Sequence, residues 1–146
     1  MEIERKFLIK EMPNNLEDYT YHDIEQGYLC TEPVMRIRKK DDHYFFTYKG
    51  KGLMVREEIE TEIPMTAYLH LKDKIDGHLI EKRRYIIPLE DLKIELDVFE
   101  GDLAPLVLAE VEFPSVERGN AFVPPEWFGR DVTETGEYQN ARLSQL

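Results

Sequence analysis

Residues 2–9 read EIERKFLI, a stretch in which charged and apolar side chains alternate at almost every step. Successive side chains of a β-strand point to opposite faces, so Glu2, Glu4 and Lys6 share one face. The other face is apolar apart from Arg5. This period is that of a strand rather than of a helix. The stretch therefore predicts a strand with one mainly apolar face and one face that carries Glu2, Glu4 and Lys6.

Similar alternation recurs along the chain and predicts its fold class. Eight stretches have the length of a strand, and they are 2–10, 21–30, 34–40, 43–50, 55–63, 79–88, 93–99 and 106–113. Short connections rich in turn-forming residues separate most of them, which is typical of antiparallel neighbours. Helical spacing occurs only after Pro64, near 13–19 and over 136–146. We therefore expect a single mainly β (α+β) domain over residues 1–146.

The charged faces of these strands contain acids and bases in nearly equal number. The acids are Glu2, Glu4, Glu58, Glu60, Glu95, Asp97, Glu110 and Glu112, and the bases are Lys6, Arg36, Arg38, Lys49, Arg56, Lys82 and Arg84. An ordinary sheet with a wet outer face is the commoner source of such alternation. The near balance of signs instead favours mutual proximity. If eight strands close into a barrel, these groups line a lumen wide enough for one small ligand, and the apolar faces point outward to be covered by helices.

Pairs of carboxylates on adjacent positions of one face indicate a cation site. Glu2 with Glu4, and Glu110 with Glu112, present the hard oxygen ligands that Mg²⁺ or Mn²⁺ prefers. Two bare carboxylates about 4 Å apart repel by roughly 4 kcal/mol at an effective dielectric of 20, so eight acids in one lumen need cations among them. Arginine forks in the same lumen match phosphate oxygens. The predicted lumen thus fits a small polyanion.

The composition limits the partners of the protein. The 19 Lys and Arg residues against 30 Asp and Glu residues give a net charge of −11, which opposes binding to a nucleic-acid duplex or an anionic membrane. No apolar run approaches the roughly 18 residues of a membrane-spanning helix. Met1 leads directly into the charged stretch and Cys30 has no disulfide partner, so a cytoplasmic protein is expected. The histidines lack metal-ligand spacing, and Cys30 is interpreted as a small packing residue.

Charged motifs follow one another in a characteristic order along nearly the whole chain. They are Glu2-x-Glu4-x-Lys6, Arg36-x-Arg38, Lys49, Arg56-x-Glu58-x-Glu60, Lys82-x-Arg84, Glu95-x-Asp97 and Glu110-x-Glu112. This set resembles that of the CYTH superfamily, the triphosphate tunnel metalloenzymes, whose N-terminal signature is E-x-E-x-K. The length and the start of the chain are most similar to the bacterial stand-alone inorganic triphosphatases of that family.

The resemblance implies a closed eight-stranded antiparallel β-barrel, a charged tunnel that binds a triphosphate, and a C-terminal helix that plugs one end. It implies that Glu2, Glu4, Glu110 and Glu112 hold Mg²⁺ or Mn²⁺. The phosphate ligands that it implies are Lys6, Arg36, Arg38, Lys49, Arg56, Lys82 and Arg84. Glu4, Glu60 and Asp97 are the catalytic candidates, as groups that assist a metal or position water. Only Arg142 could provide a basic residue from the plug.

Members of this family act on several triphosphates. They include inorganic, thiamine and RNA 5′-triphosphatases and class IV adenylyl cyclases. Recognition of a base or a thiazolium ring normally needs an aromatic or apolar platform, and the charged faces carry few aromatic residues. We therefore expect metal-dependent hydrolysis of inorganic tripolyphosphate to pyrophosphate and phosphate. A class IV-type cyclase, a thiamine or nucleoside triphosphatase, and a non-catalytic polyphosphate or nucleotide sensor are the alternatives. A homodimer is left open.

Overall fold

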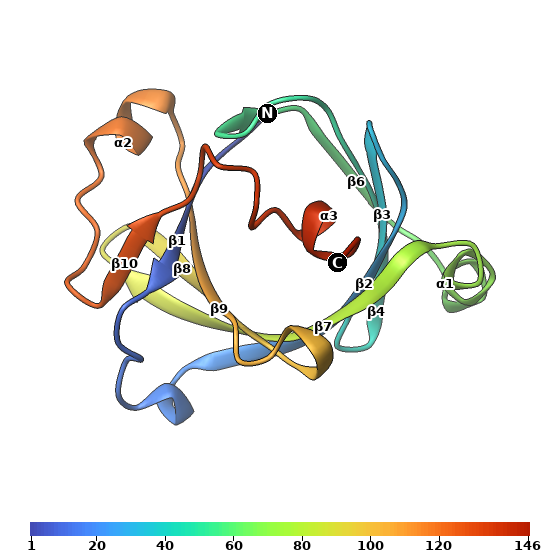
Figure 1. The fold of residues 1–146 in the computed structure, drawn as a ribbon, viewed down its shortest axis with the longest axis horizontal. Helices are drawn as coiled ribbons and strands as arrows, with labels where there is room; N and C mark the ends of the chain where they lie inside the picture. Colours follow the sequence, from blue (N-terminus) through green and yellow to red (C-terminus); the bar gives the residue numbers. More distant parts are fainter.

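Antiparallel strands form a ring in the computed structural model, which describes residues 1–146 (Figure 1). The strands are β1 (Glu2–Ile9), β2 (Thr20–Thr31), β3 (Val34–Lys40), β4 (His43–Lys49), β5 (Val55–Arg56), β6 (Glu58–Glu62), β7 (Asp76–Leu89), β8 (Leu92–Phe99), β9 (Val107–Glu112) and β10 (Phe128–Asp131). Their order in the sheet is β10-β1-β9-β8-β7-β2-β3-β4-β6, and β5 pairs with β1. The predicted antiparallel barrel is confirmed, with a short ladder between β5 and β1 as its closure.

The structure has ten strands where the sequence predicts eight. The predicted strand 55–63 is divided at Glu57 into β5, which pairs with β1, and β6, which pairs with β4. One stretch of chain thereby pairs with β1 near one end of the sheet and with β4 near the other. The additional strand β10 pairs with β1 through Phe7 and Asp131. Its four residues are too few for the period of a strand to be recognised in the sequence.

Three short helices accompany the barrel, namely α1 (Met65–Lys72), α2 (Val116–Ala121) and α3 (Asn140–Leu143), together with 3₁₀ turns at Leu16–Asp18 and Gly101–Leu103. The first begins directly after Pro64, as predicted, and packs outside β3 and β4, where the ring of Tyr68 lies 5.0 Å from that of Tyr44. The sequence does not predict α2, and α3 is shorter than the predicted 136–146. None of the helices is long and apolar enough to cross a membrane.

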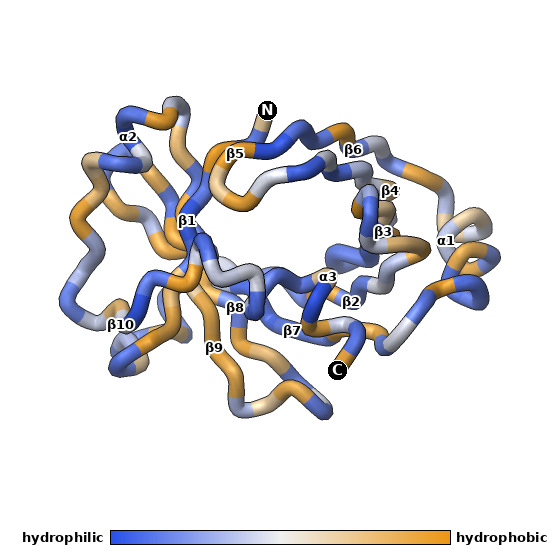
Figure 2. Tube along the Cα trace, turned by 45° about the horizontal axis from the view of Figure 1, so that its top comes forward, coloured by the Kyte–Doolittle hydropathy of each residue, from blue (hydrophilic) through white to orange (hydrophobic).

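One apolar core lies on the outer face of the barrel wall formed by β1, β7, β8 and β9. Phe7, Leu96 and Val111 are at its centre, all at most 1% exposed. The chain around Trp127 and Phe128 packs over these residues. Alternation between apolar and polar positions is visible along the strands (Figure 2). An irregular segment and β10 therefore supply much of the cover that was expected from helices.

A second apolar core lies inside the ring. Its buried members are Tyr28, Val34, Ile80, Phe99, Leu108, Val132 and Leu143. Ile80 and Leu108 occupy the same faces of their strands as Arg84 and Glu110, so the inner face changes from charged to apolar along the barrel. The predicted apolar faces still point outward, but the charged inner face ends in apolar residues that the alternation did not indicate, and α3 packs its Leu143 against them. The C-terminal segment fills this end, as predicted, and it lies within the ring in Figure 1.

Candidate active site

The charged faces of the strands converge on a cavity of about 200 Å³ inside the ring. Nineteen side chains line it, of which three, Tyr28, Val34 and Ala141, are hydrophobic. The charged ones are the acids Glu2, Glu4, Glu58, Glu60, Glu95, Glu110 and Glu112 and the bases Lys6, Arg36, Arg38, Lys40, Lys49, Arg56 and Arg84. Acids and bases are equal in number at the cavity, so its charges can compensate one another there. The excess of acids that gives the chain its net charge of −11 lies elsewhere.

The predicted site residues line this cavity with two exceptions, Lys82 and Asp97. Sequence reasoning missed Lys40, which continues the two-residue spacing of Arg38 on the same face of β3 and could have been found from it. It also missed any role for Asn140 and its neighbour Gln139, because polar residues near a chain terminus carry no periodic signal. Glu95 and Glu112 also line a depression on the outer surface, so the cavity opens on that side.

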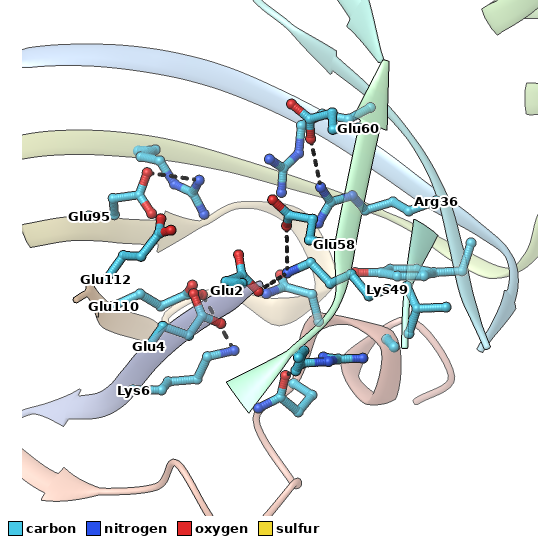
Figure 3. A pocket seen from close by; sticks show the side chains of 18 of the residues that line it. Glu2, Glu4, Lys6, Arg36, Lys49, Glu58, Glu60, Glu95, Glu110 and Glu112 are labelled. Carbon is cyan, nitrogen blue, oxygen red and sulfur yellow. Dashed lines mark hydrogen bonds and ion pairs between the residues drawn. The ribbon is translucent and has the colours of Figure 1, made fainter. Parts of the chain in front are cut away.

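Carboxylates crowd the wall formed by β1, β9 and β8 (Figure 3). Glu4 faces Glu112 across the ladder between β1 and β9, and Lys6 faces Glu110. Burial and the negative charge of Glu110 raise the pKa of Glu4 well above its usual value. Burial would also raise the pKa of Glu110, but the positive charges of Lys6, Arg84 and Lys82 outweigh burial and hold that pKa well below its usual value. Glu4 therefore keeps a proton at a pH where Glu110 has lost one.

No three acidic, histidine or cysteine side chains converge closely enough to hold a cation as they stand. The donor set nevertheless suits a hard divalent ion, because Glu2, Glu4, Glu110 and Glu112 offer only carboxylate oxygens to the cavity. A proton on Glu4 relieves the repulsion within this set, and a cation between the carboxylates would take over that task. The acidic wall thus fits Mg²⁺ or Mn²⁺ in its ligand chemistry, with ligands spaced more loosely than in a loaded site.

Bases with unused hydrogen-bonding capacity lie on β3. Arg36 Nη2 donates to Thr47 Oγ1 at 3.1 Å and lies 3.5 Å from Glu60 Oε2, but its buried Nε has no hydrogen-bond partner. An unpaired buried donor costs roughly 1–3 kcal/mol, so it indicates a place for an acceptor. Burial and the charge of Arg36 lower the pKa of Arg38 to about 9, and Arg38 has no carboxylate partner. Lys40 forms no ion pair. This row of bases is available to an anion.

Asp97 is enclosed behind the cavity surface. Its carboxylate accepts hydrogen bonds from Arg84 Nε at 2.7 Å and Nη2 at 2.9 Å, and it lies 2.7 Å from Lys82 Nζ. Burial favours the neutral acid, but Arg84 and Lys82 outweigh burial and lower the pKa of Asp97. Burial also lowers the pKa of Lys82, a shift that Asp97 opposes. Asp97 therefore holds two bases in place, and neither it nor Lys82 reaches the cavity.

The segment that leads into α3 completes the inner end of the site. The carbonyl oxygen of Tyr138 accepts a hydrogen bond from Lys6 Nζ at 2.9 Å, and Asn140 Oδ1 accepts one from Lys82 Nζ at 3.0 Å. Gln139 and Asn140 line the cavity, whereas Arg142 is exposed and outside the lining. The plug thus contributes a backbone carbonyl and amides where the resemblance pointed to a basic residue.

Known proteins are similar to this chain in architecture and in sequence. A family model described as the CYTH domain matches residues 1–140. An inorganic triphosphatase of Nitrosomonas europaea is 42% identical over 98% of this chain and 96% of its own length, and one of Acetivibrio thermocellus is 32% identical over 97% and 92%. A crystal structure of an inorganic triphosphatase superposes with a TM-score of 0.74 at 39% identity, over 100% of this chain and 95% of that one. With this match over nearly its entire length, the chain belongs to the CYTH domain family.

Proposed function

We propose that this protein hydrolyses inorganic tripolyphosphate to pyrophosphate and phosphate with the help of Mg²⁺ or Mn²⁺. The observation that carries the proposal is the unpaired Nε of Arg36, buried at a cavity that holds seven bases. Phosphate oxygens are the acceptors that a guanidinium binds best, through two parallel N–H donors. The relatives named inorganic triphosphatase support this choice of substrate.

The two kinds of wall have different tasks. The bases that would bind the phosphates are Lys6, Arg36, Arg38, Lys40, Lys49, Arg56 and Arg84, while Lys82 acts from behind the surface. The carboxylates that would hold the metal are Glu2, Glu4, Glu110 and Glu112. A bound divalent ion neutralises phosphate charge and lowers the pKa of a bound water. The small anion would thus meet positive charge on both sides, from the bases on one side and from the metal held by the carboxylates on the other.

Hydrolysis transfers a phosphoryl group to water. The fixed bases hold the phosphate chain in line for attack and stabilise the charge that moves to the leaving group. The water oxygen bonds to a terminal phosphorus, the P–O bond to the departing pyrophosphate breaks, and a proton of the water passes to a carboxylate. Glu60 lines the cavity and is one carboxylate proposed for this role, and Glu4 is the other, once its proton has been displaced by a cation bound at the acidic wall. Asp97 acts through Arg84 and Lys82 instead.

The cavity favours an inorganic triphosphate over a nucleotide or thiamine triphosphate. Tyr28 is the one aromatic side chain in the lining, and it is 2% exposed. A base or a thiazolium ring would find no open surface on which to stack. The cyclase and the thiamine or nucleoside triphosphatase therefore receive no support from the cavity. The cytoplasmic location and the homodimer stay predictions.

A side-by-side assay tests the substrate. It measures phosphate and pyrophosphate release from tripolyphosphate, thiamine triphosphate and ATP, and cyclic AMP formation from ATP, each with Mg²⁺ and with Mn²⁺. We expect the fastest turnover with tripolyphosphate. Faster turnover of either organic triphosphate would reject the proposal, and binding of tripolyphosphate without turnover would favour a sensor.

A matched pair of arginine variants tests the role of the unpaired donor. Arg36→Lys keeps the charge and loses Nε, so we expect a higher KM for tripolyphosphate. Arg83→Lys makes the same change next to Arg84 on the outer face, where Arg83 pairs with Asp23, and should leave KM unaltered. An unchanged KM in Arg36→Lys would show that no phosphate oxygen binds at Nε.

A further inference from the structure

Gln26 is a fully buried amide on β2, outside the set of residues that line the cavity. Its Oε1 accepts a hydrogen bond from Arg38 Nε at 2.8 Å, and its Nε2 donates to Tyr28 OH at 3.2 Å. Gln26 lies directly opposite Arg38 in the ladder between β2 and β3. No other side chain forms a hydrogen bond with Arg38, so Gln26 is the one hydrogen-bond partner that orients this guanidinium.

The partner of Arg38 differs from those of most bases in the site, although Arg56 likewise contacts only the carbonyl oxygen of Gly50 and the amide oxygen of Gln139. The ion pairs of the site are Lys6 with Glu110, Lys49 with Glu2 and Glu58, Arg36 with Glu60, Arg84 with Asp97 and Glu95, and Lys82 with Asp97. Arg38 contacts a neutral amide at the position where these bases contact a carboxylate. Its charge is therefore compensated by no direct ion pair, and this leaves it free to attract an anion.

We propose that Gln26 is a positioning residue that orients Arg38 without neutralising it, and that this neutrality determines how tightly the site binds the substrate phosphates. The identity of the substrate rests on the proposed function. An amide and a carboxylate have nearly the same shape, so Glu at this position would keep the hydrogen bond to Arg38 Nε. It would also form a buried ion pair that compensates the charge of Arg38 before any phosphate arrives.

The charged groups around Arg38 support the proposal that the Gln26 amide leaves the charge of Arg38 uncompensated. Arg36 on β3 and Arg84 on β7 repel it, and Asp97 on β8 is the nearby acid. Asp97 is already held by Arg84 and Lys82 at 2.7 Å each, so it has no oxygen directed at Arg38 in a hydrogen bond. The uncompensated charge of Arg38 is thus a property of the assembled barrel, and the residue that preserves it is Gln26.

Kinetics of two substitutions test the proposal. We expect Gln26→Glu to raise the KM for tripolyphosphate by at least about tenfold, because a negative charge is placed beside the phosphate site. Gln26→Met, which removes both hydrogen bonds and adds no charge, should raise KM by less than Gln26→Glu does but by more than about twofold. Gln145→Glu is the matched control, since it makes the same charge change at an exposed position and should keep the wild-type KM. A KM of Gln26→Glu within about twofold of wild type would overturn the proposal.

A spectroscopic measurement separates positioning from packing. The Nε–H signal of Arg38 in ¹⁵N NMR, identified by its loss in Arg38→Lys, should be protected from exchange in wild type and Gln26→Glu and unprotected in Gln26→Met. A protected signal in Gln26→Met would overturn the positioning role. If Gln26→Glu does not fold, the KM of Gln26→Met decides, and a value within about twofold of wild type overturns the proposal. Failure of the wild type to hydrolyse tripolyphosphate would instead overturn the proposed function, and the NMR result does not depend on it.

Discussion

Replacement of Asp97 by asparagine removes the negative charge that Arg84 and Lys82 share inside the barrel. The side chains of Asp97 and Lys82 are both 0% exposed, and that of Arg84 is 8% exposed. Asparagine has nearly the same shape and can still accept one of the three contacts. The substitution therefore changes the charge of the cluster far more than its packing.

The structure allows the size of the effect to be worked out. Removal of one member of a buried ion pair costs about 3–5 kcal/mol, because the partner stays buried with an uncompensated charge. Asp97 has two such partners, of which Arg84 keeps a second contact to Glu95 Oε2 at 3.3 Å, so we expect a cost within this range. A kcal/mol corresponds to about 2–4 °C of Tm for a domain of this length. Asp97→Asn should thus lower Tm by roughly 6–20 °C.

Thermal melts followed by circular dichroism measure this shift. Asp91→Asn is the matched control, because Asp91 binds Arg118 through two contacts of 2.9 and 3.0 Å but lies exposed on the surface. Solvent screens that pair, so the control should melt like wild type. Equal Tm values for Asp97→Asn and wild type would refute the buried-charge reasoning. If kcat alone were lost, Asp97 would return to the catalytic role predicted from the sequence.

The pH dependence gives an independent check. Asp97 ionises more readily in the folded protein than its ordinary pKa of 3.8 implies, since Arg84 and Lys82 outweigh the effect of burial. A lowered folded-state pKa means that the unfolded chain binds more protons, so the contribution of Asp97 is fully present above its unfolded pKa. That contribution is lost as the pH falls through the folded pKa. The Tm difference between wild type and Asp97→Asn should therefore shrink in acid.

Three further outcomes are expected. Lys40→Met should raise the KM for tripolyphosphate by at least about threefold, whereas Lys39→Met, with the same charge change on the outer face, should not; identical kinetics would place Lys40 outside the substrate site. EDTA should abolish turnover, and Glu4→Gln should lower activity at least as much as the loss of any one base; full activity of thoroughly chelated enzyme would contradict metal dependence. Tripolyphosphate with Mg²⁺, at about a hundred times Kd, should raise Tm by roughly 5–10 °C relative to chloride of matched ionic strength, and by less in Arg36→Ala. Superimposable melting curves in the two salts would count against an anion site inside the barrel.

Strand alternation was enough to predict most of the barrel and most of its lining. The doublets Glu2-x-Glu4 and Arg36-x-Arg38 specify which residues share a face, and the structure places all four at the cavity. The division of 55–63 was not predictable, because β5 and β6 read as one alternating run. The run divides where the chain leaves β1 to pair with β4, and the distance between these two strands depends on how the whole sheet curves.

By itself, the sequence determined the fold class, the antiparallel order of neighbouring strands and which charged residues share a face, because a period of two assigns every side chain to one side of a strand. Only the tertiary structure decided which charges meet. It joined Asp97 to Arg84 and Lys82 and removed it from the cavity, and it left Arg36 Nε and Arg38 without carboxylate partners. Such pairings depend on the register and tilt of strands that are distant in the chain, so the sequence pattern alone does not contain them.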